Sequence, residues 1–220
     1  MSTGTGSSST KQAVLDRLAA EQAAWDALVA EVDPAWAAEP NAMSAWSFKD
    51  VVAHLSGWRQ PFVNDVVATV QGTRPPALDW PVAHQETEED TPEGEEKTQA
   101  VNDWLFERNR HRTYDQVLAE AALQWAMLRA AMALMPDDLA ERRGLIGGLG
   151  GESLAEALLR PVTFPHFHEE HEPEIRAWLA IRREGAPIDA EEPPTCVNCG
   201  GVIGQEDFVC PHCGVSLVAG

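Results

Sequence analysis

The amino-acid sequence predicts an all-α protein that ends in a small cysteine-rich module. Three observations lead to this fold class. Apolar residues recur at three- and four-residue spacing along several long segments, which is the period of an amphipathic helix. Serine or threonine residues, which are good helix caps, stand immediately before some of these segments. All four cysteines fall within the last 25 residues, in two CxxC pairs, so this end of the chain differs from the helical part.

Six helical segments follow from the apolar pattern and its breaks. Ser47 with Asp50, and Thr113 with Gln116, have the spacing of capping boxes at the starts of two helices. Pro61 falls inside the second segment. Because proline has no backbone N–H, it should kink or split the helix there; alternatively, the helix tolerates it as an irregularity. The predicted helices cover residues 11–32, 48–70, 97–109, 114–135, 154–160 and 163–184.

A long acidic loop is predicted between the second and third helices. Residues 72–96 contain four prolines, and eight acidic residues against the single basic residue Arg74. A loop of this length is either disordered or a lid over a site. We expect disorder for residues 85–96 and packing against the helices for Trp80.

One histidine lies on the apolar stripe of the second helix. His54 shares this stripe with Val51, Leu55, Trp58 and Phe62, so its ring should face the core. A buried histidine needs partners for its ring nitrogens. Taken alone, His54 is best interpreted as a core histidine that is hydrogen-bonded to a carbonyl or a side chain.

A second group of histidines changes this interpretation. His168 and His171, three residues apart on the last helix, share a stripe with Phe167 and Trp178, whereas His166 lies off that stripe. Three inward imidazoles, from His54, His168 and His171, could hold a divalent metal ion with a coordination position left open.

The order of these motifs resembles the DinB-like four-helix-bundle superfamily, and within it the ClbS/DfsB branch. The resemblance rests on "KDVVAHLSGW" at 49–58, on "VNDWLFERNRHRTYDQVLAE" at 101–120, and on the histidine-rich helix that continues into "IRAWL". It implies an up-down bundle whose metal site takes one histidine from the second helix and two ligands from the last. The last-helix pair of that family is usually four residues apart, whereas here the residue four before His171 is Phe167.

The cysteine pairs predict a structural zinc site. Ten residues separate Cys196 and Cys199 from Cys210 and Cys213, a spacing that lets two tight knuckles bring four thiolates around one zinc ion. The pattern resembles a β zinc ribbon, which folds only with its metal. The sequence therefore divides into a disordered tail at 1–10, a four-helix bundle at 11–184, a linker at 185–195 and a zinc ribbon at 196–220.

The negative charge of the chain argues against nucleic acid and anionic membranes as partners. Sixteen Lys and Arg against 35 Asp and Glu give a formal net charge of −19, which disfavours nucleic acid and anionic membranes. We expect no apolar run long enough to span a bilayer. The N-terminus has neither the basic nor the apolar region of a secretory signal, and cysteines spaced for metal binding rather than for disulfides suit a reducing compartment, so we expect a cytoplasmic protein.

Two functions follow from these patterns. The first is an enzyme that uses a zinc or nickel ion in the bundle for hydrolysis or thiol transfer on a reactive small molecule, a detoxification role that the resemblance implies. Glu170 and Asp103 are its candidate general bases. The second is a non-catalytic ligand-binding or scaffold protein, in which the ribbon contacts a protein partner or stabilises a homodimer. A nucleic-acid regulator is disfavoured by the charge.

Overall fold

The computed structural model describes residues 9–40, 42–43, 45–81, 91–184 and 213. The chain divides into two compact units, Met1–Leu179 and Ala180–Gly220. Most of the predicted tail, the linker at 185–195, and Cys196, Cys199 and Cys210 of the predicted ribbon lie outside the described residues. Cys213 is described, and it is exposed.

The part of the chain that the structure describes is mostly helical and contains no strand, which confirms the all-α prediction for that part. The elements, in chain order, are α1 (Thr10–Ala30), α2 (Phe48–Gln71), α3 (Pro92–Asn109), α4 (Tyr114–Leu134), α5 (Asp137–Ala140), the 3-10 turn η1 (Gly147–Leu149), α6 (Leu154–Leu158), the π-helical segment η2 (His166–His171) and α7 (Glu172–Arg183).

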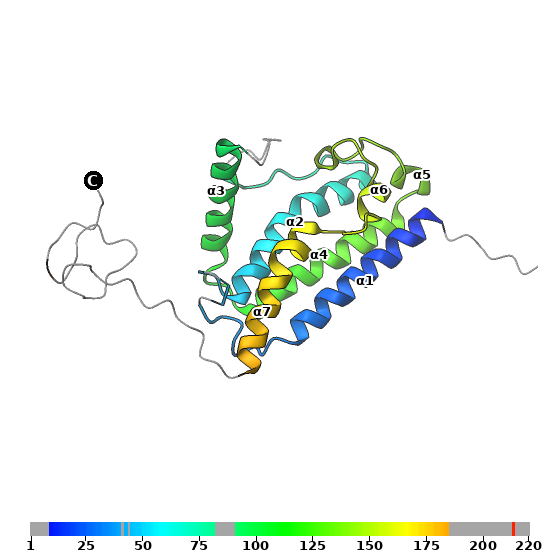
Figure 1. Cartoon of the computed structure of the whole chain (residues 1–220). Helices are drawn as coiled ribbons and strands as arrows, with labels where there is room; N and C mark the ends of the chain where they lie inside the picture. The colour runs from blue at the N-terminus through cyan, green and yellow to red at the C-terminus, as the bar shows by residue number, and fades with distance from the viewer. Residues whose placement is uncertain (1–8, 41, 44, 82–90, 185–212, 214–220) are drawn as a thin grey trace, which may run out of the picture. The chain divides into compact units, whose positions relative to one another are not determined.

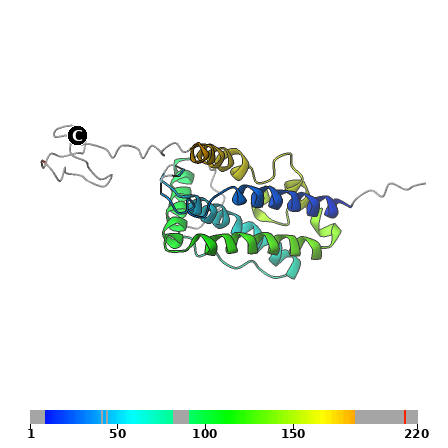
Figure 2. The same cartoon turned by 90° about the horizontal axis from the view of Figure 1, so that it is seen from below.

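A helical bundle forms the first unit. α4 packs against both α1 and α2, and α3 packs against α2 at one end of these helices, as Figures 1 and 2 show. Aromatic rings connect the late segments to this bundle, since Trp178 of α7 stacks on Phe48 of α2 and Phe167 of η2 packs on Trp25 of α1. The largest fully buried apolar side chains come from α1, α2, α4, α6 and α7 and from the residue that follows α4, namely Leu18, Leu28, Phe48, Leu128, Met132, Met135, Leu154, Ile175 and Leu179.

The predicted capping boxes are confirmed and explain where helices begin. The Ser47 hydroxyl accepts a hydrogen bond from the Asp50 N–H, and the Asp50 carboxylate accepts one from the Ser47 N–H, which together fix the start of α2. Thr113 and Gln116 do the same for α4. Gly72 ends α2 in the left-handed conformation that favours glycine, with φ of 64°. Pro61 does not split α2, which is one helix from Phe48 to Gln71.

The predicted acidic loop is shorter than the sequence suggested. Thr91 caps α3 by accepting a hydrogen bond from the Gly94 N–H, and Pro92 takes the first helical position, where a missing N–H costs nothing. The prediction of disorder is therefore wrong for residues 92–96, while residues 82–90 lie outside the described part. Trp80 packs edge-on against Trp58, with ring centroids 5.1 Å apart, as expected.

One expectation about membranes is corrected by α4. Among the described helices, α4 is long and apolar enough, by length and composition alone, to cross a bilayer. A core helix of a soluble protein meets the same criteria. In this bundle α4 buries Val117, Ala121, Trp125, Leu128 and Met132, whereas Leu123 and Leu134 of the same helix are exposed.

A candidate metal centre

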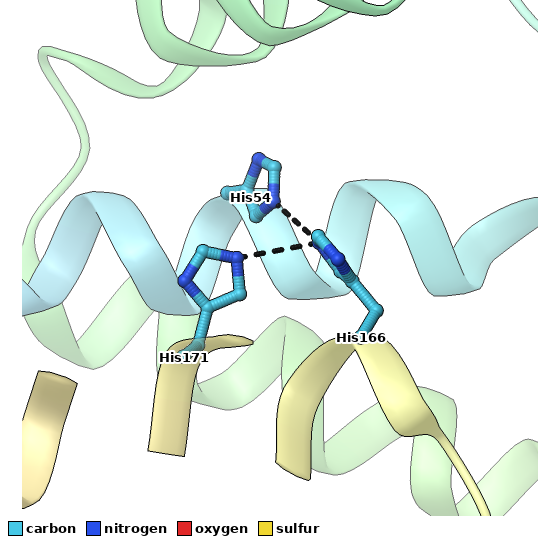
Figure 3. A group of neighbouring side chains, drawn as sticks. All are labelled: His54, His166 and His171. Carbon is cyan, nitrogen blue, oxygen red and sulfur yellow. Dashed lines mark hydrogen bonds between the residues drawn. The ribbon is translucent and has the colours of Figure 1, made fainter. Parts of the chain in front are cut away.

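Three histidines from two segments converge beside a cavity. His54 projects from α2, and His166 and His171 come from the two ends of η2, as Figure 3 shows. The Nε2 atom of His166 lies 2.9 Å from Nε2 of His54 and 3.3 Å from Nε2 of His171. Among the described residues, these three offer ligand nitrogens that all lie within 4.8 Å of one another.

The π-helical geometry of η2 brings His166 into this group. In an α-helix, residues five apart lie roughly 140° apart around the axis. A π-helix bonds residue i to residue i+5, so residues five apart lie on the same side. The expectation that His166 lies off the inward stripe is therefore wrong, and so is the expectation that His168 and His171 converge. His54 faces inward as predicted, and its side chain is 4% exposed.

The backbone just before η2 adopts an uncommon conformation. Phe164 has φ of 58°, a left-handed value that is a genuine outlier for a bulky residue. Its ring packs against Trp125 at 5.4 Å and Phe62 at 6.4 Å between centroids, and these contacts hold it there. Such strain persists only where surrounding packing imposes it, and it gathers at functional sites.

Electrostatics keep two of the histidines neutral. Burial, with smaller contributions from the neighbouring rings of His171 and His166, lowers the pKa of His54 to about 3. Burial, together with His166, lowers the pKa of His171 to about 4, against a small opposing effect of Glu170. Neutral imidazoles carry the nitrogen lone pair that a metal ion requires.

The donor set fits a divalent transition metal. Nitrogens bound to zinc at about 2.0–2.1 Å in tetrahedral geometry are roughly 3.3 Å from one another, which is close to the two observed separations. Imidazole suits zinc and nickel alike. Three ligands are one fewer than a closed structural site uses, so a position remains for water or a substrate.

Glu170 orients one of the three rings. A carboxylate oxygen of Glu170 lies 3.1 Å from Nδ1 of His166. A carboxylate on the far nitrogen of a ligand histidine fixes the tautomer that directs the Nε2 lone pair toward the metal. Asp103, the other predicted general base, accepts a hydrogen bond from Gln99 and does not line the cavity beside the histidines.

Glu170→Ala should weaken metal binding about tenfold, the lower end of the roughly 10–100-fold cost of losing such a partner, because water can reach this exposed pair. Competition with a chromophoric chelator measures the affinity. Glu169→Ala is the matched control, since it removes the same charge from the next residue. Equal affinities for the two variants would contradict the orienting role.

His168 has a different role from the one predicted. Its Nε2 lies 2.7 Å from Glu21 of α1, and its Nδ1 lies 2.8 Å from Glu172 of α7. Burial lowers the pKa of His168, but the hydrogen bonds and charges of Glu21 and Glu172 outweigh it, so the net pKa is raised. An imidazolium that donates from both nitrogens has no lone pair for a metal. The structure therefore places His168 in a clamp between α1 and α7.

This clamp should make stability depend on pH. A raised pKa means that the contribution of His168 is fully present below its unfolded pKa of 6.5 and is lost as pH rises through the higher folded value. The difference in unfolding free energy between wild type and His168→Gln should therefore be largest below pH 6.5 and shrink as the pH rises above it. Urea titrations with chelator present measure it, and a difference independent of pH would contradict the clamp.

A cavity of about 640 Å³ opens onto the three histidines. Trp46 and Trp58 form its aromatic wall, and the Trp58 ring is held by a hydrogen bond of 2.8 Å from its indole N–H to the Asn102 side chain. Glu95 and Glu170 supply carboxylates to the same wall. The arrangement can admit a small polar molecule to the nitrogens that would hold a metal.

The sequence identified His54 and His171 as candidate ligands, and the structure brings both into the cluster. In the structure, His166 joins this cluster in place of the predicted His168. Of the predicted zinc-ribbon ligands, only Cys213 is described. No family model matches the chain, and neither a curated protein nor a solved structure matches it.

Proposed function

We propose that this protein is a metal-dependent enzyme of the DinB-like bundle type that acts on a reactive small molecule by hydrolysis or thiol transfer. One observation carries the proposal: three imidazole nitrogens from α2 and η2 converge at the wall of a cavity of about 640 Å³. The order of the sequence motifs supports the same family. A zinc ion held by Cys196, Cys199, Cys210 and Cys213 would be structural, in a reducing cytoplasm.

The residues of the site have distinct roles in this proposal. His54, His166 and His171 would hold a zinc or nickel ion, which when bound lowers the pKa of a water or thiol or polarises an electrophile. Trp46 and Trp58 line one wall of the cavity and would shield it from water. Glu170 holds the proton on Nδ1 of His166, and Glu95 is a carboxylate on the same wall that can accept a proton released by the nucleophile.

Two reaction screens test this proposal on protein loaded with zinc or nickel. One follows hydrolysis of activated esters and amides, and the other follows transfer of small thiols to an aryl halide. Activity should disappear in His54→Ala and persist in His168→Ala, because His54 belongs to the cluster and His168 does not. Equal activity in both variants would refute a reaction at the three histidines.

A second candidate is a non-catalytic ligand-binding protein. The observation in its favour is another cavity, mostly apolar, which shares His166 and Trp58 with the first. Metal-loaded protein that binds small molecules but is inactive in both screens would support this candidate.

A further inference from the structure

A second cavity, of about 260 Å³, also has His166 in its lining. This is slightly below the about 300–1,000 Å³ of pockets for drug-sized ligands, so it suits a small molecule. Its lining is dominated by aromatic side chains from α1, α2, α4 and the segment before and within η2. These are Trp25, Trp58, Phe62, Trp125, Phe164 and Phe167.

A partly buried arginine stands in this apolar lining. The guanidinium of Arg59 lies 4.6 Å above the ring of Trp125, and its Nε donates a hydrogen bond of 3.1 Å to the side-chain oxygen of Gln124. Gln124 is 2% exposed, and its amide nitrogen donates to the Ser56 carbonyl and to Gln60. The amide is thus fixed with its oxygen toward Arg59, and the arginine is held by packing and by a neutral acceptor.

Arg59 has no carboxylate partner among the described residues. A guanidinium offers five N–H donors, and the hydrogen bond to Gln124 uses one. The other charged groups that line the cavity are already paired. Glu21 binds Arg17 and His168, and Arg160 pairs with Glu152.

The positive charge of Arg59 is retained despite its surroundings. Burial lowers the pKa of Arg59 to about 10, which leaves the group protonated at neutral pH. A desolvated charge without a counter-ion costs free energy. A carboxylate is the group that matches the planar fork of arginine in two parallel hydrogen bonds.

We propose that this cavity binds a small amphipathic carboxylate, with its apolar body among Trp25, Phe62 and Trp125 and its carboxylate on Arg59. The site needs no metal ion, so it stands independently of the proposed enzyme activity and specifies a ligand class for the second candidate function. The net charge of −19 would repel an anion in general, so a preference for the anion must arise locally.

Calorimetric titration of the full chain with 4-phenylbutyrate and with its neutral amide tests the proposal. Wild type should bind the carboxylate about ten- to a hundredfold more tightly, the range that a hydrogen bond to a charged group provides. In Arg59→Gln the carboxylate and the amide should bind equally, at the affinity of the amide for wild type. Arg160→Gln is the matched control: it removes the same charge from the same cavity, but that arginine is already paired, so the preference should persist.

A second variant, His171→Ala, distinguishes this site from the metal centre. His171 does not line the apolar cavity, so His171→Ala should keep the preference for the carboxylate even if it loses a metal. Loss of the preference in His171→Ala would show that the carboxylate binds at the histidines, which overturns the proposal. Preference retained in Arg59→Gln, or binding of neither compound to wild type, would overturn it as well.

Discussion

Replacing His166 with alanine should remove about one metal ion per chain at micromolar metal concentrations, because the variant keeps two of three ligands. The loss of affinity should exceed the roughly 10–100-fold cost of removing an outer partner such as Glu170. His54→Ala and His171→Ala should give the same result, since each removes one of the converging nitrogens.

Metal content by inductively coupled plasma mass spectrometry, on protein purified without chelator or histidine tag, measures this effect. The comparison is a difference between variants, so metal held elsewhere in the chain cancels. His168→Ala is the control, because His168 lies between two carboxylates on the same stretch of chain. A metal loss in His168→Ala as large as in His166→Ala would refute the assignment of ligands made from the π-helical geometry.

Leu128→Ala should lower the free energy of unfolding by about 2–5 kcal/mol, the range for truncating a fully buried leucine. Leu128 is 0% exposed on the face of α4 that packs into the bundle. The lost contacts and the cavity left behind both contribute to this cost.

Leu134→Ala provides a matched comparison on the same helix. Leu134 is 75% exposed, so the same truncation should change stability by no more than about 0.5 kcal/mol. Urea unfolding followed by tryptophan fluorescence, with chelator present in both cases, measures the two values. Similar losses for both variants would mean that α4 does not pack in the bundle as described.

Helix starts were predictable because they depend on local chemistry. Ser47 with Asp50 and Thr113 with Gln116 each satisfy two backbone N–H groups within four residues, so the sequence alone locates them. The start of α3 was missed because acidic composition and proline suggested a loop, although Thr91 and Pro92 are favourable at a helix N-terminus. The inward direction of His54 followed from the regular period of α2.

The ligand set was only partly predictable because the period of the chain changes at η2. The prediction assumed 3.6 residues per turn, which pairs His168 with His171. Pro173 was the signal that could have indicated otherwise, since it has no N–H to donate to the Glu169 carbonyl and so interrupts the regular α-helical ladder. The preference of His168 for Glu21 depends on a contact between residues 147 positions apart, which no local pattern reveals.

The π-helical segment has a consequence for how such a centre is recognised in other sequences. One additional residue between two histidines is absorbed by widening a single turn, so HxxxxH in a π-helix presents the same pair of nitrogens as HxxxH in an α-helix. A search pattern restricted to the shorter spacing would overlook this chain. A pattern that accepts either spacing, and asks for a proline shortly after the longer one, would include both.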